Sequence, residues 1–257
     1  DVVVTNHTLL AIEIVDSHPI LPERDAVILD EAHEFMDRTT QAVTEELTAG
    51  RVQRAAAMAR KYLPGKASDA LTNAADSFDD AMSDYGEQIK GDFSAQGRLE
   101  EIPSALEAPI RKLKEAATAV VQLISADDEI IDPDENAERA RVKGAVNEIA
   151  TTAGKLLKMG DEHVLWYEPT FSTLHLAPLS VSHVLRSNLL TKTPVIATSA
   201  TLTVGNNFDA MARSIGFVVG TDSDAETDSD DIDPANVQML DVGSPFDFAN
   251  QGVLYMP

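Results

Sequence analysis

Short apolar runs lie toward the two ends of this chain, and a long stretch with helical periodicity lies between them. β-Branched and aliphatic residues fill positions 2–4 and 26–29, and a third run spans 194–198. Uninterrupted apolar runs of this length are typical of strands that are buried on both faces of a parallel sheet. We therefore predict strands at these three places, with a short helix at 9–15 between the first two.

From about residue 39 the apolar residues recur at steps of three and four, which is the period of an amphipathic helix. Clear series begin at Leu71, Ile102 and Val146, and an earlier helix is expected at 41–62. These helices, with little strand signal among them, predict an all-helical block of about 125 residues.

A strand pattern returns after the helical block. Residues 173–177 alternate, 181–190 suit a helix, 208–215 could be helical, and 237–242 form a candidate final strand. The pattern predicts the α/β class: one domain interrupted by a helical insertion, with residues 1–38 and 166–220 sharing a sheet. The acidic segment 222–233 is expected to be a solvated loop.

The charge of the chain is strongly negative, with 43 acids, 20 bases and a net charge of -23. This argues against broad, non-specific binding of nucleic acid, which depends on Lys and Arg. Most of the bases lie within 39–165, so contact with a polyanion is expected there. The absence of cysteine favours a cytoplasmic setting, and no apolar run is long enough to predict a membrane span. Because the chain opens on Asp1 without a methionine, we expect a fragment of a longer protein.

The stretch VILDEAHEF at 27–35 carries the strongest chemical signal. Asp30 and Glu31 directly follow a predicted strand, where ligands bind in open α/β folds. In a nucleotide hydrolase one such acid holds Mg²⁺, usually through water, and the next orients or deprotonates the attacking water. The alternative is an acidic turn that the dipole of a following helix favours.

Two further motifs bear on the interpretation of this stretch. A zinc site at His33 and Glu34 would need His-Glu-x-x-His, but position 37 is Asp37, so we reject it. Ser199 and Thr201 follow the strand at 194–198 and could sense the nucleotide state of the DEAH segment through hydrogen bonds. Hydroxyl residues also commonly cap a helix, and that alternative stays open.

Two local features complete the candidate chemistry. Asn6 and His7 leave the first predicted strand, where they could contact a ligand or close a turn. A phosphate-binding loop would have the pattern G-x-x-x-x-G-K-[ST]. The Gly-Lys pairs at 65–66 and 154–155 both lack the leading glycine, so the 257 residues contain no such loop.

Taken together, the motifs resemble those of one helicase family. The chain is similar, motif by motif and in order, to the DinG/XPD-like branch of superfamily-two DNA helicases, with the bacterial DinG type nearest. The stretches that carry this resemblance are DVVVTNHTLL, VILDEAHEF, STLHLAPLSV, VIATSATL and VGSPFDFANQGVLYMP.

The resemblance implies a specific domain organisation. Such helicases have two RecA-like P-loop NTPase motor domains, and an all-helical arch domain is inserted into the first. By this comparison 1–38 is a motor segment with the DEAH motif, and 39–165 is the arch. Residues 166–235 would return to the motor domain with the SATL motif and the acidic loop, and 236–257 would begin the second motor domain.

The resemblance also implies an activity and the residues that perform it. These helicases use ATP to move 5′ to 3′ on single-stranded DNA, in repair or replication. Asp30 would bind Mg²⁺, and Glu31 would contact the nucleotide and act as general base. His33, Ser199 and Thr201 would couple hydrolysis to movement on DNA.

Other partners follow from the same resemblance. Basic clusters in the arch are candidate DNA-backbone contacts, although the pattern favours a solvated helix face: Arg51, Arg54, Arg111, Lys112, Lys114, Arg139, Arg141 and Lys143. Many members bind a [4Fe-4S] cluster, whose cysteines would lie outside this chain. The chain alone should be inactive, because the phosphate loop and the arginine finger would lie elsewhere. The alternative function is a non-enzymatic helical module that docks protein or DNA on a motor-domain scaffold.

Overall fold

A computed structural model of the chain describes residues 1–16, 18–91, 97–125, 133–203, 207–217 and 237–243, together with Asn250 and Val253. The chain divides into two compact units, one formed by Asp1–Asp37 with Val181–Pro257 and the other by Arg38–Ser180. Helices and small sheets are both present, so the predicted α/β class is confirmed at that level. No helix among the described residues is long and apolar enough to cross a membrane. The acidic segment 222–233 lies outside the described residues.

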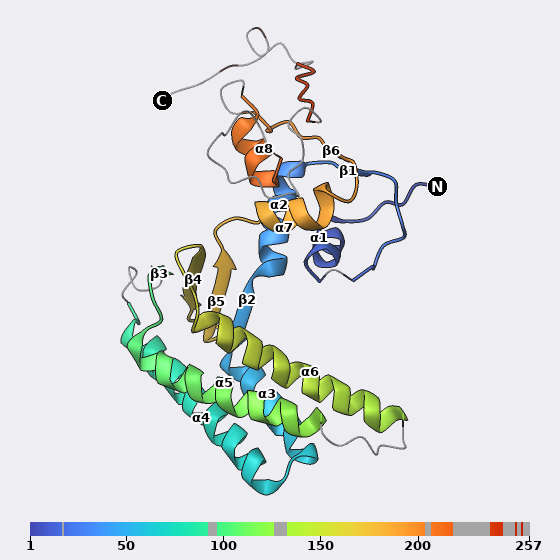
Figure 1. Cartoon of the computed structure of the whole chain (residues 1–257). Helices are drawn as coiled ribbons and strands as arrows, with labels where there is room; N and C mark the ends of the chain where they lie inside the picture. The colour runs from blue at the N-terminus through green and yellow to red at the C-terminus, as the bar shows by residue number, and fades with distance from the viewer. Residues whose placement is uncertain are drawn as a thin grey trace. The chain divides into compact units, whose positions relative to one another are not determined.

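The first unit is built around two short parallel strands (Figure 1). Strands β1 (Val27–Leu29) and β6 (Val195–Ala197) pair in parallel, so that Val27 faces Val195 and Leu29 faces Ala197. The helical elements of this unit are α1 (His7–Asp16), the start of α2 (Ala32–Val43), α7 (Ser182–Leu185), the π-helical turn η2 (Arg186–Leu190) and α8 (Asp209–Ile215). The predicted helices at 9–15, 181–190 and 208–215 are therefore confirmed, the second of them with a change to π geometry.

Four strand predictions for this unit need correction, two in their existence and two in their burial. Residues 2–4 and 237–242 form no strand in the described structure, and Val2 and Val4 are each 91% exposed. The strands at β1 and β6 exist, but they are not buried on both faces, because Ile28 and Ile196 are exposed whereas Val27 and Leu29 are buried. A run of β-branched residues signals only a preference for burial, and neighbouring elements must supply the cover.

A buried carboxylate fixes the loop that leads into β1. Glu13 on α1 accepts hydrogen bonds from the backbone N–H groups of Ile20 and Leu21, at 2.8 and 2.5 Å, and pairs with Arg24 at 2.5 Å. Burial by itself raises the pKa of the Glu13 carboxyl, but the Leu21 N–H, Arg24 and the Ile20 N–H together hold that pKa below its usual value. The loop thus brings the chain back into β1 in a defined position.

The second unit combines four long helices with a small antiparallel sheet (Figure 1). The helices are α3 (Ala49–Ala59), which the 3₁₀ turn η1 (Arg60–Tyr62) extends, α4 (Gly65–Gln88), α5 (Ser104–Ser125) and α6 (Pro133–Leu156). The strands are β2 (Glu45–Thr48), β3 (Arg98–Leu99), β4 (His163–Glu168) and β5 (Thr173–Pro178), in the order β2-β5-β4-β3. This unit reaches Ser180, beyond the predicted insertion at 39–165.

The sheet overturns the prediction that the insertion is all-helical. The strand expected at 173–177 exists as β5, but it pairs with β2 and β4 and not with the sheet of β1 and β6. Strand β2 has the sequence Glu-Glu-Leu-Thr and lies inside the range predicted as a helix at 41–62. Its partner β5 is far away in the sequence, so no local pattern marks these four residues as a strand.

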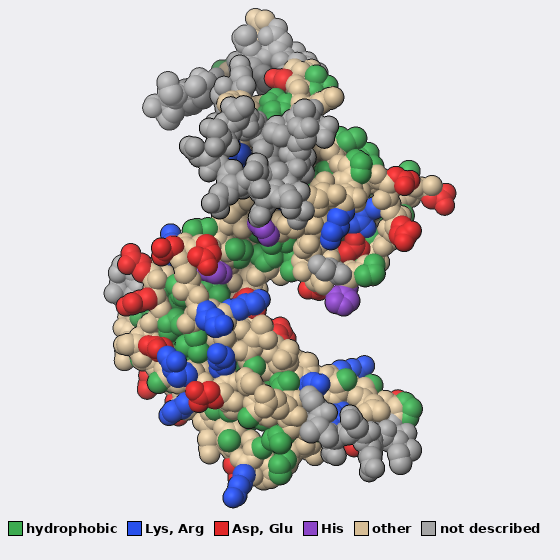
Figure 2. Space-filling model, in the orientation of Figure 1, with side chains coloured by type: hydrophobic (Ala, Val, Ile, Leu, Met, Phe, Trp, Pro, Cys, Tyr) green, Lys and Arg blue, Asp and Glu red, His purple; other side chains and the backbone are tan. Residues whose placement is uncertain are grey.

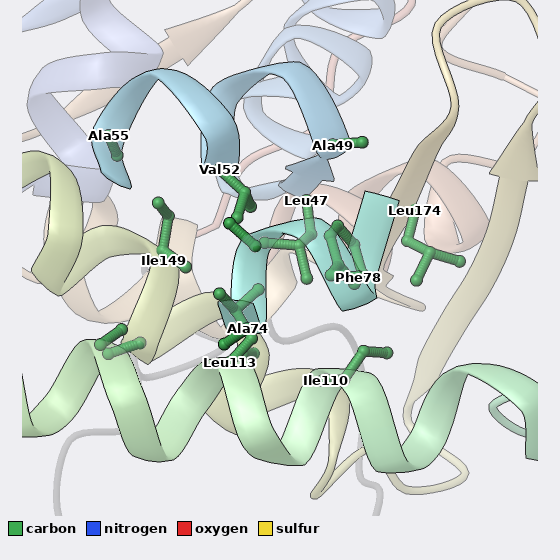
Figure 3. Packing of buried hydrophobic residues seen from close by; sticks show 14 of the residues in the cluster. Leu47, Ala49, Val52, Ala55, Ala74, Phe78, Ile110, Leu113, Ile149 and Leu174 are labelled. Carbon is green, nitrogen blue, oxygen red and sulfur yellow. The ribbon is translucent and has the colours of Figure 1, made fainter. Parts of the chain in front are cut away.

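One hydrophobic core joins the sheet to the helices. Leu47 and Leu174 lie on the sheet face that meets Phe78, Leu113 and Ile149 of the helices (Figure 3). The predicted helical series from Leu71 and Ile102 are confirmed as α4 and α5, whose apolar positions are buried from Leu71 and from Leu106 onward; Ile102 itself lies just before α5 and is partly buried. Burial of this contiguous cluster is the main source of stability for the unit.

A close contact explains why α4 contains a glycine near its end. A Cβ at Gly86 would lie 2.6 Å from the Tyr167 Oη atom. Tyr167 is only 2% exposed, its hydroxyl donates to the Met82 carbonyl at 3.3 Å, and its ring meets Tyr85 edge-on. The tyrosine therefore cannot easily move away, and only glycine allows this approach of α4 to β4.

The substitution Gly86→Ala is expected to lower the free energy of unfolding by about 1–3 kcal/mol, the usual cost of overpacking. Helix propensity alone predicts the opposite, a gain of about 1 kcal/mol. The control is Gly144→Ala on α6, where no atom lies within 4 Å of the new Cβ and a small gain is expected. Denaturant titration measures both, and the cost at Gly86 should shrink in a Tyr167→Phe background. An equal gain at both glycines would contradict the steric explanation.

Candidate functional site

The carboxyl ends of β1 and β6 bring two distant sequence motifs together. The Thr198 N–H donates to the Leu29 carbonyl at 2.8 Å, directly beyond the last paired residues of the two strands. Because the strands are parallel, the residues that follow them emerge at the same edge. The predicted meeting of the DEAH stretch with Ser199 and Thr201 is therefore present in the structure.

A backbone irregularity follows β1 and places Asp30 and Glu31 outside the regular hydrogen bonding between β1 and β6. The Thr198 carbonyl accepts from the Ala32 N–H at 2.9 Å, one residue later than a continuing parallel ladder would place the donor. Glu31 takes up the extra residue with a positive φ of 49°, which is uncommon for a residue with a side chain. Asp30 and Glu31 thus form a bulge between β1 and the first turn of α2, and both acids are exposed.

The Asp30 carboxylate is held on one of its two oxygens. Its Oδ1 atom accepts from the Thr198 hydroxyl at 3.0 Å and from the Glu31 N–H at 3.1 Å. A carboxylate has about four acceptor positions, so these two bonds orient the group without saturating it.

The Ser199 hydroxyl contacts Glu31, His33 and Thr201. Its Oγ atom lies 2.8 Å from His33 Nδ1 and 3.2 Å from Glu31 Oε2. It also lies 3.2 Å from the Thr201 N–H and 3.3 Å from the Thr201 Oγ1. All four predicted catalytic and coupling residues of the two motifs, Glu31, His33, Ser199 and Thr201, therefore share one hydrogen-bond network.

Counting protons assigns the donors in this network. A serine hydroxyl has one proton to give, and an ionised Glu31 can only accept, so Ser199 donates to Glu31. The Thr201 N–H can only donate, and Ser199 accepts that bond. In this arrangement a proton on His33 Nδ1 completes the network by donating to Ser199; the tautomer is assigned from the hydrogen-bond pattern and not observed. The imidazole orientation is thus tied to the charge of Glu31, 3.4 Å away.

The donor set fits a magnesium ion bound with a nucleotide. Among the described residues, no group of three or more His, Asp or Glu side chains could hold a metal ion by itself. Magnesium is usually held by one or two carboxylates together with water and substrate phosphates, so a single exposed, oriented carboxylate suits it. Asp30 fits this requirement as a single carboxylate.

The remaining candidates of the first unit have structural contacts. The Asn6 Oδ1 atom accepts from the Leu9 N–H at 2.8 Å and so caps the start of α1. The His7 ring meets the Phe35 ring edge-on, with centroids 5.5 Å apart. These contacts favour the turn-closing interpretation, although His7 remains partly exposed.

The basic clusters belong to the second unit and differ in their accessibility. Arg51 pairs with Glu148 at 2.6 Å, and Arg111 pairs with Glu107 at 2.5 Å. Arg139 is buried, 9% exposed, which makes it a poor candidate for a surface DNA contact. The other members remain at least partly exposed: Arg54, Lys112, Lys114, Arg141 and Lys143. On the face that Figure 2 shows, Lys and Arg over the helices are interspersed with acidic side chains.

Sequence reasoning missed one residue of the site, Thr198. Its hydroxyl contacts Asp30; the string TSATL marks Thr198 as one of the small hydroxyl residues able to hydrogen-bond the DEAH segment, but not as a candidate site residue. A signal was available, because Thr198 and Ser199 place two consecutive hydroxyls at the end of a strand that could pair beside two consecutive acids.

Comparison with known proteins agrees with the motifs. No protein-family model matches the chain. The ATP-dependent helicase DinG of Mycobacterium tuberculosis and that of Mycobacterium bovis are each 32% identical to it over 268 aligned residues. The alignment covers 100% of this chain and 36% of each relative, so the chain spans little more than a third of their length. The resemblance that the motifs predicted is thus confirmed: the whole of this chain is similar to part of the DinG type of ATP-dependent helicase.

Proposed function

We propose that this chain is part of an ATP-dependent DNA helicase that moves 5′ to 3′ on single-stranded DNA in repair or replication. It would supply the later part of the first RecA-like motor domain and its arch insertion. One observation carries the proposal: Ser199 joins Glu31 to His33 at the edge where the two parallel strands end. The similarity of the whole chain to proteins named ATP-dependent helicase supports it.

The chemistry would be divided between the two acids. Asp30 would bind Mg²⁺, which when bound neutralises charge on the phosphates. Glu31 would accept the proton of the attacking water, as a general base must. Its side chain is 55% exposed, so water and a nucleotide can reach it.

Coupling would run through the Ser199 hydroxyl. When Glu31 gains or loses a proton, the bond that Ser199 donates to it weakens or strengthens, and the His33 and Thr201 contacts of the same hydroxyl must adjust. A change of protonation at Glu31 would thereby alter the contacts of His33, which lies in the first turn of α2, and of Thr201, which lies in the segment after β6.

Contacts with DNA are proposed for the exposed bases of the second unit. Arg54, Lys112 and Arg141 are exposed and Lys114 and Lys143 are partly exposed. Arg51 and Arg111 would have to exchange their glutamate partners for phosphates, which costs little for surface pairs. Asn6 and His7 are weaker candidates because each already has a structural contact.

The cofactors follow from the same proposal. ATP and Mg²⁺ would bind to the longer protein, and a [4Fe-4S] cluster there would use cysteines outside this chain, which contains none. The chain alone is expected to lack ATPase activity because its sequence contains no phosphate-binding loop.

The test uses the full-length protein that carries this chain. We expect an ATPase that single-stranded DNA stimulates, and unwinding of a duplex with a 5′ single-stranded tail in preference to one with a 3′ tail. Binding to single-stranded DNA should weaken as salt increases, because Lys and Arg would neutralise phosphates. ATP-independent binding to a protein or DNA partner, with no DNA-stimulated ATPase, would instead support the non-enzymatic docking module.

A further inference from the structure

The two hydroxyl residues that follow β6, Thr198 and Ser199, each contact a different one of the two acids that follow β1. The Thr198 Oγ1 atom lies 3.0 Å from Asp30 Oδ1, and the Ser199 Oγ atom lies 3.2 Å from Glu31 Oε2. Ser199 is shared with His33 and Thr201, whereas the other acceptor near the Thr198 hydroxyl is the Leu29 carbonyl at 3.5 Å. Adjacent hydroxyls thus serve different chemical groups.

The backbone of Thr198 is unusually well fixed for an exposed residue. Its N–H donates to the Leu29 carbonyl at 2.8 Å, and its own carbonyl accepts from the Ala32 N–H at 2.9 Å. These two bonds hold it between the end of β1 and the start of α2. The β-branched side chain has few χ1 rotamers, so the hydroxyl is aimed by the backbone. Its single proton goes to the nearer acceptor, the carboxylate of Asp30.

As a consequence, the two carboxylate oxygens of Asp30 differ in the hydrogen bonds that they accept. The Oδ1 atom accepts two hydrogen bonds, from the Thr198 hydroxyl and the Glu31 N–H. Both hydrogen bonds to Asp30 among the described residues are made to Oδ1, so we assign Oδ2 as the oxygen available to a cation. Without the threonine donor, the carboxylate would be held by one backbone bond and could rotate about χ2. Groups that orient a metal-binding carboxylate typically change metal affinity by about 10–100-fold when they are removed.

We propose that Thr198 is a positioning residue for Asp30, which holds the carboxylate ready for the divalent cation that accompanies the nucleotide. This inference rests on the proposed function and deepens it. Thr198 acts on cation binding, whereas Ser199 acts on the Glu31 and His33 network. The two neighbouring hydroxyls therefore control separate properties of one site.

The test compares Thr198→Val with Thr198→Ser in the full-length protein that carries this chain. Valine keeps the shape but loses the donor, whereas serine keeps the donor. Thr198→Val should raise the Mg²⁺ concentration needed for half-maximal ATPase by about tenfold, with little loss of kcat at saturating Mg²⁺. Binding of Mn²⁺ in the presence of a non-hydrolysable ATP analogue, followed by electron paramagnetic resonance, should weaken to the same degree. Thr198→Ser should behave like the parent protein in both measurements.

Two controls separate this role from a general effect. Ser199→Ala should lower kcat and leave the Mg²⁺ midpoint unchanged. Thr191→Val removes an exposed hydroxyl that contacts the Ser187 carbonyl and no acid, so it should change neither quantity. Circular dichroism checks that each variant is folded. An unchanged Mg²⁺ midpoint and Mn²⁺ affinity in Thr198→Val would overturn the inference, as would equal losses in Thr198→Ser. Absence of both ATPase and Mn²⁺-nucleotide binding in the unmutated protein would overturn the proposed function itself.

Discussion

Replacing Glu31 by Gln is expected to lower ATP turnover of the full-length protein at least about 100-fold while nucleotide binding is largely retained. Glutamine has nearly the same shape and can still accept from the Ser199 hydroxyl, so the local structure should persist. It cannot take a proton from water, so only the chemical step should fail. The positive φ of residue 31 remains the same for both side chains, which keeps the comparison free of backbone effects.

The measurement pairs steady-state ATPase with equilibrium binding of a fluorescent nucleotide. A matched control is Glu34→Gln, which makes the same chemical change one turn along α2 at an exposed side chain. This control should retain most of its turnover. Turnover by the Glu31 variant close to that of the unmutated protein would remove the general-base role. A loss of nucleotide binding as well as turnover would instead indicate that Glu31 mainly positions the nucleotide.

Replacing Phe78 by Ala is expected to lower the free energy of unfolding of the second unit by about 3–5 kcal/mol. Phe78 is 0% exposed and lies where α4 meets the sheet, near Leu47 and Leu174 (Figure 3). Helices on several sides fix the surroundings, so the cavity cannot collapse fully. This is the largest effect on stability that we expect from a single substitution.

The only tryptophan of the chain makes this measurement specific. Trp166 lies on β4, stacked on His175, so its fluorescence reports on the second unit and not on the first. Chemical denaturation should show a lower midpoint for Phe78→Ala. Phe171→Ala, at a side chain that is 68% exposed between β4 and β5, is the control and should shift the free energy by less than about 0.5 kcal/mol. Similar shifts for both variants would show that the core is less tightly packed than described.

The placement of the candidate site was predictable because its residues are concentrated in short, contiguous motifs. An apolar run followed by Asp30 and Glu31 indicates where the strand ends, and a second run before Ser199 indicates a partner edge. Parallel strands place such residues at one edge whatever the length of chain between them. The long amphipathic helices were predictable for a similar reason, since each buried position repeats within its own segment.

Other features depend on partners that the local pattern does not contain. Strand β2 is polar and short, and it becomes a strand only because β5 pairs with it. Conversely, residues 2–4 have a strong strand pattern but form no strand in the described structure. Arg139 looks like an exposed base in the sequence, yet the packing of α6 buries it.

By itself, the sequence of this protein determined the long helices of the second unit and the two strands that carry the DEAH and SATL motifs, and it singled out Asp30 and Glu31 as the candidate reactive acids. Only the tertiary structure decided which atom contacts which: the bulge at Glu31, the sharing of Ser199, and the bond from Thr198 to Asp30. The physical reason is the separation along the chain of the residues that interact. Periodicity and motif spacing are properties of neighbouring residues, whereas a hydrogen bond across more than 160 residues exists only after the two strands have paired.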